Sequence, residues 1–336
     1  MSSIYAISIT LLIFLSNSFV PSTELENEST LYVDDDNIKG PWNGTPDHPY
    51  KSIQDAINNA SDGDGIFVKE GIYFENIHIN KSIELHGENK YSTVIDGKYL
   101  NRSNTSTIVY IVASEASFDN FTITYSNMSV YTQDIGSIYI NNSRMIQINN
   151  SIICKQRAYA DAGIIIRYSS DILIENNHIR SPMPAAVGIG FVASSSVQIK
   201  HNRIDGDFIY GISGGPENVL IKENVICNAS MAITVSGSGP LLENNIWIIG
   251  NHIENNGYGI LLRRCKNVRI EQNNFIKNDH SAGFNNCISN IWNNNYWDRP
   301  RILPVIIKGY IHTIPSIPWF NIDQHPAQNL IIYRDG

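Results

Sequence analysis

Charged side chains are scarce in this chain. Asp, Glu, Lys and Arg make up 17% of its 336 residues, against about 25% in an ordinary soluble domain. The good helix formers Ala, Leu, Glu and Lys are also few, which argues against a helical bundle or a coiled coil. Acidic residues outnumber basic ones by 32 to 24, giving a formal net charge of −8. This balance argues against a nucleic-acid partner bound through a basic patch.

Isoleucine and asparagine are abundant instead. The chain contains 55 Ile and 40 Asn, and 42% of its residues are hydrophobic. So many apolar residues argue against an intrinsically disordered chain. The length is sufficient for a sizeable core, in one large domain or in two.

An apolar segment lies near the N-terminus, at residues 4–15. It is too short for a comfortable membrane span, and small polar residues follow it, so residues 1–22 are predicted to be a secretory signal peptide. No Lys or Arg precedes the segment, and an uncleaved anchor or an ordinary buried segment are the alternatives. No later segment has 18 apolar residues, so we expect no membrane span in the mature chain. The predicted location is secreted, extracellular or at the cell surface.

Eleven N-x-S/T sequons agree with export. Ten of them fall within the first 150 residues. This clustering is typical of a glycoprotein, and chance occurrence in an Asn-rich chain is the alternative. The acceptor positions are Asn27, Asn43, Asn59, Asn80, Asn101, Asn104, Asn120, Asn127, Asn141, Asn149 and Asn228.

One short motif repeats through the middle of the chain. It has two branched apolar residues two apart, two further residues, an Asn, any residue and a last apolar residue, as in ILIENNHI at 172–179 and VQIKHNRI at 197–204. Successive copies are 21 to 27 residues apart. A weaker copy has Ser151 at the Asn position, and the other copies have Asn177, Asn202, Asn224, Asn251, Asn273 and Asn294 there.

The motif has the spacing of a strand followed by a corner. Ile172 and Ile174 are two apart, so they face the same side of a strand, and the three-residue step to Asn177 breaks the alternation. A second short strand, often opened by Gly, precedes each motif, as in GIGFV from residue 188. Three short strands and three turns per repeat predict an all-β protein. Its fold would be a right-handed parallel β-helix, a β-solenoid of about nine or ten coils.

The recurring Asn has a structural interpretation. Its amide carries two donors and an acceptor, so Asn side chains stacked in equivalent corners can bond to one another in a ladder. We therefore expect Asn177, Asn202, Asn224, Asn251, Asn273 and Asn294 to form one ladder. A row of Asn side chains that binds a ligand is the alternative.

The two ends of the coil need protection, because a bare end exposes sheet edges. SIQDAINNA at 52–60 predicts a short N-terminal capping helix, with Ser52 and Asp55 at its start and Ile53 and Ile57 on its apolar face. The Pro-rich segment 299–336 is interpreted as a C-terminal cap or tail. The predicted organisation is a signal peptide at 1–22, a β-helix with its cap at 23–298, and this last segment.

At this point the chain resembles a known group. It is similar to the right-handed parallel β-helix proteins of the pectin-lyase-like superfamily, and most to the NosD-like and CASH-type repeat proteins of archaeal and bacterial surfaces. The segments that carry the resemblance are YVDDDN at 32–37, the stretch 49–89 with TVIDG at 93–97, and the tail at 295–310 and 317–328. This fold carries lyases, hydrolases, epimerases, esterases and non-enzymatic adhesins, so the resemblance implies a fold rather than an activity.

Catalytic candidates are few. The motifs of polygalacturonases, of related epimerases and of pectin methylesterases are not matched in full. The best remaining cluster is HNRIDGD, in which His201, Arg203, Asp205 and Asp207 place two carboxylates beside two bases, a combination suited to acid–base work. The alternative is a solvated turn with ion pairs between coils, each of which stabilises little.

Two tryptophans are candidates for sugar contact. Trp247 and Trp292 are predicted to point outward from their strands, where an indole ring can stack on a sugar ring. Packing of Trp247 under a long turn is the alternative.

Cys265 and Cys287 are 22 residues apart and are predicted to lie at nearly the same place on adjacent coils. That separation suits a disulfide, and buried free thiols are the alternative. Asp62 and Asp64 can contribute to a Ca²⁺ site but belong to no complete Ca²⁺ loop. The nine His show no zinc spacing, so no metal site and no cofactor are expected.

Three functions remain open. The favoured one is binding of polysaccharide or glycoprotein glycans along the side of the coil, without catalysis. The second is a polysaccharide lyase, hydrolase or epimerase, and the third is a structural module of the cell envelope or of adhesion. No nucleic-acid partner is expected, and the sequence does not define the oligomeric state.

Overall fold

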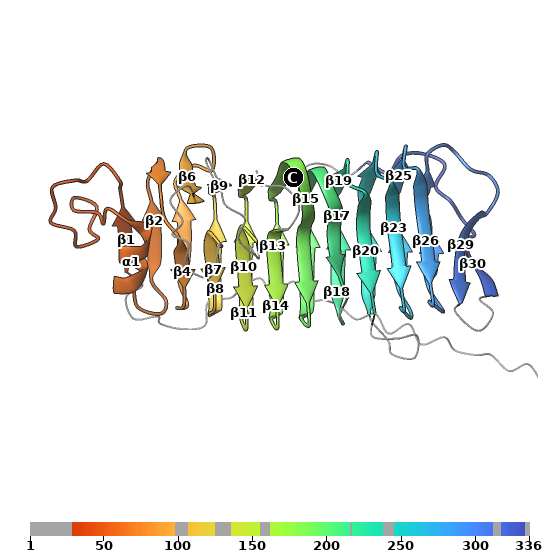
Figure 1. Cartoon of the computed structure of the whole chain (residues 1–336), viewed down its shortest axis with the longest axis horizontal. Helices are drawn as coiled ribbons and strands as arrows, with labels where there is room; N and C mark the ends of the chain where they lie inside the picture. Colours follow the sequence, from red (N-terminus) through yellow and green to blue (C-terminus); the bar gives the residue numbers. More distant parts are fainter. Residues whose placement is uncertain are drawn as a thin grey trace, which may run out of the picture.

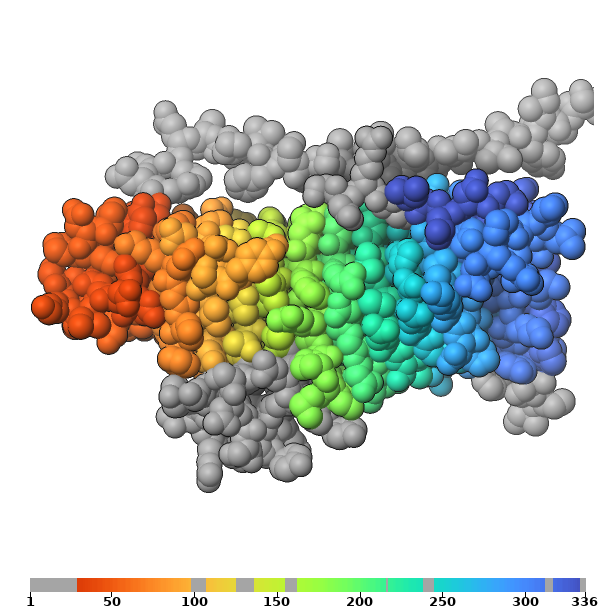
Figure 2. All heavy atoms as spheres, turned by 90° about the horizontal axis from the view of Figure 1, so that it is seen from above, coloured from red at the N-terminus to blue at the C-terminus, as the bar shows by residue number. Residues whose placement is uncertain are grey.

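The structure is a computed structural model that describes residues 29–97, 107–124, 136–154, 162–215, 217–237, 245–311 and 317–332. The predicted signal peptide and the sequons at Asn27, Asn101, Asn104 and Asn127 lie outside these residues. The chain winds as a parallel β-helix, which confirms the predicted fold class (Figure 1). Sequence order becomes position along the long axis of the molecule, as the colour gradient in Figure 2 shows.

Each turn contributes one strand to each of three parallel sheets, here called sheets A, B and C. The strands of sheet A carry the paired apolar residues of the repeat. They are β1 (Thr30–Val33), β2 (Gly65–Val68), β5 (Glu84–Gly87), β8 (Ser114–Asp119), β11 (Arg144–Asn149), β14 (Ser170–Glu175), β16 (Ser195–Lys200), β18 (Val219–Lys222), β21 (Ile246–Ile249), β24 (Arg269–Glu271) and β27 (Ile291–Asn293).

Sheet B follows the corner that contains the recurring Asn. Its strands are β3 (Gly71–Tyr73), β6 (Thr93–Asp96), β9 (Thr122–Thr124), β12 (Ile152–Cys154), the first parts of β15 (His178–Val192) and β17 (Arg203–Gly214), β19 (Val225–Cys227), β22 (His252–Glu254), β25 (Asn274–Ile276) and β28 (Tyr296–Trp297).

Sheet C closes each turn. It contains β4 (Ile77–Ile79), β7 (Val109–Ile111), β10 (Ile138–Asn141), β13 (Ala162–Arg167), the second parts of β15 and β17, β20 (Met231–Ser236), β23 (Tyr258–Arg263), β26 (His280–Asn285) and β29 (Val305–Ile311).

The interior consists of stacked rows of like side chains. In sheet A, Ile146, Ile172, Val197, Val219 and Ile246 lie opposite one another in register, and none is more than 1% exposed. Such rows place branched apolar side chains against similar branched neighbours on the pleated surface. The abundance of Ile in the composition therefore reflects the interior of the solenoid.

Glycine at the start of a sheet C strand has a steric cause. A Cβ atom at Gly188 would lie 2.6 Å from the carbonyl oxygen of Gly211 and 2.8 Å from Cγ2 of Ile204. Both distances are shorter than a real Cβ contact, so a side chain there would force the neighbouring turn to move.

The corner between sheets A and B contains the predicted Asn ladder. Asn224 Nδ2 donates to the Ile199 carbonyl oxygen at 2.8 Å and to Asn251 Oδ1 at 3.0 Å, while Asn224 Oδ1 accepts from the Asn202 backbone N–H at 2.9 Å and from Asn202 Nδ2 at 3.0 Å. The ladder members are at most 2% exposed. The ladder therefore satisfies buried backbone groups that would otherwise have no partner.

The prediction that Asn294 is the last Asn of the ladder is wrong. Asn295 holds that place, and its backbone N–H and Nδ2 both donate to Asp323 Oδ2. Asn294 lies beside it with a positive φ of 54°. The three consecutive Asn at 293–295 allow two alignments one residue apart, and a one-residue slip reverses the facing of every side chain on a strand.

The same slip explains why Trp292 is not exposed. It lies opposite Ile270 in the interior, with 3% of its surface exposed. Its ring centroid is 6.0 Å from that of Trp297, which continues the inner row of sheet B. Trp292 is therefore a core residue, and the prediction that it points outward to contact sugar is wrong.

A second ladder runs along the corner between sheets C and A. Ser143 Oγ accepts from the Ala113 backbone N–H at 3.1 Å, and Ser169 Oγ accepts from the Ser143 backbone N–H at 3.1 Å. Cys265 and Cys287 occupy the equivalent corner in later turns, where Cys287 Sγ accepts from the Cys265 backbone N–H at 3.2 Å. Both cysteines are buried free thiols in the structure, and no disulfide joins them.

Tight corners also account for many of the other asparagines. Twenty-four non-glycine residues of the described chain have positive φ, and eleven of them are Asn. Asn tolerates this left-handed conformation better than other side chains do. Asn thus serves two roles in one corner, as at Asn176, which has a φ of 56°, and Asn177, which belongs to the ladder.

Both ends of the solenoid carry separate elements. The predicted capping helix is α1 (Ile53–Asn59), and its N-cap Ser52 accepts from the Asp55 backbone N–H at 3.1 Å. Glu75 also accepts from the first two helical N–H groups, those of Ile53 and Gln54. At the opposite end, β29 and β30 (Ile317–Asp323) pair as an antiparallel hairpin (Figure 1).

Replacing Asn224 by Leu tests the ladder. Leu removes the acceptor of the Asn202 N–H and the donor to the Ile199 carbonyl, and each buried unpaired group costs about 1–3 kcal/mol. We expect a marked drop in the unfolding midpoint, measured by thermal denaturation. Asn293→Leu, at an exposed strand position, is the control and should change little. Equal midpoints for Asn224→Leu and wild type would refute a structural ladder.

Replacing Cys287 tests the equivalence of thiol and hydroxyl in the second ladder. Cys287→Ser keeps an acceptor for the Cys265 N–H and should change stability by about 1 kcal/mol or less. Cys287→Val has similar volume but no acceptor, and should be less stable than Cys287→Ser by about 1–3 kcal/mol. Mass spectrometry under non-reducing conditions should find both thiols free, and a mass loss of one bridge would contradict the structure.

Candidate functional site

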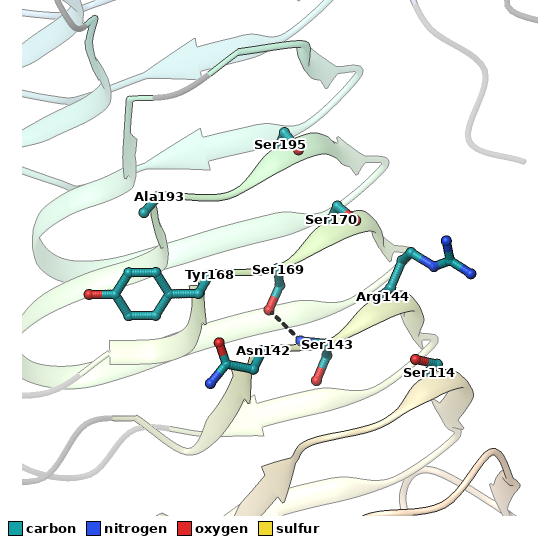
Figure 3. A pocket seen from close by; sticks show the side chains of 9 residues that line it. All are labelled: Ser114, Asn142, Ser143, Arg144, Tyr168, Ser169, Ser170, Ala193 and Ser195. Carbon is teal, nitrogen blue, oxygen red and sulfur yellow. Dashed lines mark hydrogen bonds between the residues drawn. The ribbon is translucent and has the colours of Figure 1, made fainter.

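A polar groove lies on the outside of the corner between sheets C and A (Figure 3). Its volume is about 470 Å³, and it extends across the turns that contain β8, β11, β14 and β16. None of the lining side chains is acidic. They are Ser114, Asn142, Ser143, Arg144, Tyr168, Ser169, Ser170, Ala193 and Ser195.

The floor of the groove is the serine ladder. Ser169 Oγ accepts from the Ser143 backbone N–H, the bond drawn in Figure 3, and donates to the Arg167 carbonyl oxygen at 2.7 Å. Ser143 Oγ donates to the Asn141 carbonyl oxygen at 2.9 Å. These two hydroxyls therefore hold the corner together, and ligand contact falls to the side chains above them.

The walls carry the accessible groups. Tyr168 and Asn142 extend from one side of the groove and Arg144 from the other, and all three are exposed (Figure 3). Tyr168 has 62% of its surface exposed. The groove therefore presents an aromatic ring, an amide and a guanidinium group to the same space.

Tyr168 has an unusual backbone for its residue type. Asn142, Tyr168 and Ala193 occupy equivalent corners with φ values of 48°, 50° and 49°. A left-handed conformation is ordinary for Asn but costs a bulky residue on the order of 1–3 kcal/mol. Arg264 holds the equivalent corner of a later turn with a φ of 53°, so the strained backbone belongs to the corner itself. The exposed ring, placed across the groove from Arg144, is what makes Tyr168 a candidate functional residue.

The four predicted catalytic residues are not brought together. His201 lies at the corner between sheets A and B, where its Nδ1 is 3.1 Å from Glu175 Oε1 and its Nε2 is 2.5 Å from Glu223 Oε2. Arg203 and Asp205 lie on the outer face of sheet B, with Arg203 Nε 2.7 Å from Asp205 Oδ2. Asp207 is exposed further along the same strand.

His178 is the partner that the sequence pattern did not single out. Its Nε2 is 3.1 Å from Asp205 Oδ2, so Asp205 contacts an imidazole and a guanidinium at once. Register could have found it, because His178 and Arg203 both follow a ladder Asn by one residue and lie opposite each other. A carboxylate and an imidazole in contact can exchange a proton, but these side chains are about one quarter to one half exposed, as in ordinary surface ion pairs.

Outside the core, some aromatic side chains stack in rows and others are exposed. Trp247 lies in the outer row of sheet A between Leu220 and Arg269, as predicted, and is half-buried there. A row that sequence reasoning missed contains His78, Tyr110 and Tyr139, with centroids 5.2 and 5.3 Å apart. Stacked rings offer mainly their edges, whereas Tyr168 has no such ring partner among the described residues.

The carboxylates considered for Ca²⁺ are engaged elsewhere. Asp64 accepts from Ser29 Oγ and from the Ser61 backbone N–H, both at 2.7 Å, and Asp62 accepts from the Ser82 backbone N–H at 2.8 Å. Burial opposes ionisation of Asp64, but these hydrogen bonds outweigh it and lower its pKa. Across the described parts of the chain, no three His, Cys, Asp or Glu side chains gather closely enough to hold a metal ion.

The His201 corner has its own electrostatics. Partial burial opposes ionisation of Glu223, but hydrogen bonds from His201 and Lys222 outweigh it and lower the pKa of Glu223. Lys200 Nζ lies 3.5 Å from Glu175 Oε1 on the other side of His201. This corner is a charge-compensated surface cluster.

Acid titration tests this cluster. Because the pKa of Glu223 is lower in the folded state, its contribution to stability is present above the unfolded value of about 4.3 and is lost as the pH falls through the folded value. Glu223→Gln should therefore lose less stability than wild type between neutral and acid pH, by about 1 kcal/mol or less. Thermal melts across this pH range measure the slope of stability against pH. Exposed Glu217→Gln is the control, and a Glu223→Gln slope equal to that of wild type would contradict the assignment.

Two solved structures resemble the fold of this chain over most of their length. The A-module of mannuronan C-5 epimerase AlgE6 from Azotobacter vinelandii has a TM-score of 0.57 at 14% identity, covering 74% of this chain and 72% of that one. The structure of XylC in complex with xylose has a TM-score of 0.59 at 13% identity, covering 88% of this chain and 73% of that one. At such identities the likeness concerns the fold alone. No curated protein matches the sequence.

The described residues contain no helix long and apolar enough to cross a bilayer.

Comparison with protein families identifies the group to which the chain belongs. The sequence matches the family model described as periplasmic copper-binding protein (NosD) over residues 57–309. This match covers more than half of the chain and includes the repeats, their corner ladders and the polar groove, so the chain belongs to the NosD family.

Proposed function

We propose that this protein binds a polysaccharide or a protein-linked glycan in the polar groove on the side of its solenoid, without catalysing a reaction on it. The observation that carries the proposal is Tyr168, which is held outward in a strained conformation across the groove from Arg144. The groove and its ring face the exterior, so a chain ligand can lie along the coil.

The lining chemistry suits a sugar. A pyranose ring has an apolar face that packs on an aromatic ring, and hydroxyl groups that both donate and accept. Asn142 offers amide donors and an acceptor, Arg144 offers donors only, and Ser114 and Ser195 offer hydroxyls. Arg144 forms no ion pair with the described residues, so its charge is available to a ligand.

The length of the groove favours an oligosaccharide over a single sugar. Four sheet A strands pass beneath it, and neighbouring strands are about 4.8 Å apart, which gives a run of about 14 Å. Two proteins with a similar fold support the idea, since one is a mannuronan epimerase and the other, XylC, is in complex with xylose.

The groove chemistry favours binding over turnover. Acid–base chemistry on a glycan calls for paired carboxylates or a comparable acid and base at the bound sugar, and the groove lining contains no acidic side chain. Asp205 and Glu223, which contact basic side chains, lie on other faces of the coil, where they pair with Arg203 and His201. A secreted, periplasmic or cell-surface location would give such a site access to glycans.

The copper binding in the family description is not part of this proposal. Copper sites use clustered His, Cys or Met side chains, and no such group of three His, Cys, Asp or Glu occurs in the described residues. The closest soft pair, Cys265 and Cys287, uses its sulfurs as ladder donors and acceptors. The residues described here therefore do not fit a copper site.

Glycan-array binding with matched variants tests the proposal. Tyr168→Asn should weaken binding by about tenfold or more, since it removes a stacking ring worth about 1.5 kcal/mol or more. The same change places Asn in a left-handed corner, so its melting temperature should stay level or rise. Loss of binding would then not reflect unfolding.

The control for this experiment is Tyr91→Asn, because Tyr91 is 74% exposed and distant from the groove. It should bind as wild type does. Arg144→Ala should also weaken binding. Binding by Tyr168→Asn equal to wild type would refute the groove, and release of reducing ends or unsaturated uronates from a polysaccharide panel would refute a non-catalytic role.

A further inference from the structure

Exposed hydrophobic side chains gather at the C-terminal end of the solenoid. Of the twenty large hydrophobic residues exposed in the described chain, ten lie between residues 302 and 332. They are Ile302, Leu303, Ile306, Tyr310, Ile317, Trp319, Phe320, Ile322, Leu330 and Ile332. A concentration of exposed apolar side chains in one region is typical of an interaction surface.

The β29–β30 hairpin organises this surface. Its inner positions face the last turn, with Ile307 2% exposed and Asp323 fully buried. Its outer positions form the cross-strand pairs Ile306–Ile322, Lys308–Phe320 and Tyr310–Pro318. We call these six outer residues the end face.

None of the described elements covers the end face. The hairpin is the last element in the row of strands, beyond β26, at the end opposite α1 (Figure 1). A solenoid normally ends in a capping element whose outer surface is polar. Here Ile306 and Phe320 are 60% and 56% exposed, so the cap closes the ladder on its inside and presents apolar groups on its outside.

The charge of this end differs from that of the whole chain. Lys308 is the one charged side chain of the end face and is exposed, while Asp323 is buried on the inner side as the end of the ladder. The chain as a whole has a net charge of −8. The end face is therefore both apolar and cationic.

We propose that the end face docks on a lipid bilayer that carries anionic headgroups. Tyr is among the aromatic residues favoured at the membrane interface, where Tyr310 would sit. Ile306, Phe320 and Ile322 would enter the boundary of the acyl chains, and Lys308 would reach back to the headgroups. Each cation near an anionic bilayer adds attraction that salt weakens.

A second copy of the chain is a poorer occupant. Two end faces placed together would bring Lys308 of one copy near Lys308 of the other. The opposite end of the solenoid has a cluster of acids, but Asp34 already pairs with Lys69 at 2.9 Å and Asp35 accepts from the Ile72 backbone N–H at 3.2 Å. Those carboxylates are satisfied within their own chain.

Vesicle sedimentation with the purified protein tests the proposal. We expect binding to phosphatidylcholine vesicles that contain phosphatidylglycerol, weaker binding without it, and a decrease with added salt.

Matched variants separate docking from folding. Phe320→Ser with Ile322→Ser should weaken vesicle binding by about tenfold or more, since each removes a large apolar group from the contact. Ile72→Ser is the control, because Ile72 is 51% exposed at the other end and Ile322 is 48% exposed. Lys308→Glu keeps the apolar face and should weaken binding to anionic vesicles alone.

Three results would overturn the proposal. The first is no sedimentation with any of these vesicles, and the second is equal binding by the Phe320→Ser, Ile322→Ser double variant and wild type. The third is a dimer in light scattering that dissociates in the double variant, which would assign the end face to a second copy. These vesicles carry no glycan, so the outcome does not depend on the proposed glycan groove.

Discussion

The hydrogen bond from a corner side chain to the backbone of the preceding turn is the interaction on which this structure depends. A solenoid turn exposes its edges until the next turn covers them, and the corners lie where strand pairing is interrupted. Asn fills this gap because its amide bonds to the backbone and to the next amide at once, as at Asn224. Ser and Cys do the same with one atom at the second corner, and a buried carboxylate, Asp323, ends the first ladder.

Periodicity was enough to predict the fold, and ambiguity in periodicity produced the errors. The ladder from Asn177 to Asn273 follows directly from a repeat whose strand and corner have fixed lengths. At residues 293–295 three Asn in a row removed that information, so Asn294 was placed in the ladder and Trp292 on the surface. The register contained enough information to find His178, the partner of Asp205, although the motif did not single it out. The contacts of His201 with Glu175 and Glu223 depend on rotamers at the corner, which the register does not define.

The candidate site emerged from a departure from the repeat. At the corner between sheets C and A, Asn142 suits a left-handed backbone and Ala193 is small, whereas Tyr168 places an exposed aromatic ring there. The sequence alone could not show this, since the left-handed conformation of position 168 is a property of the folded corner. Most of the polar side chains in the described residues have architectural roles, whereas Tyr168 and Arg144 face the groove, and Arg144 forms no ion pair with the described residues.

A solenoid also converts sequence distance into a fixed spatial distance. The groove reaches β16, and five steps of about 4.8 Å separate that strand from the terminal hairpin along sheet A, which makes about 24 Å. The stacked ladders leave little freedom between the two, because every turn is bonded to its neighbours at its corners. A bilayer bound at the end face would therefore hold the groove at a fixed distance along the coil from the point of attachment, because the turns between them cannot change their spacing without breaking the ladders.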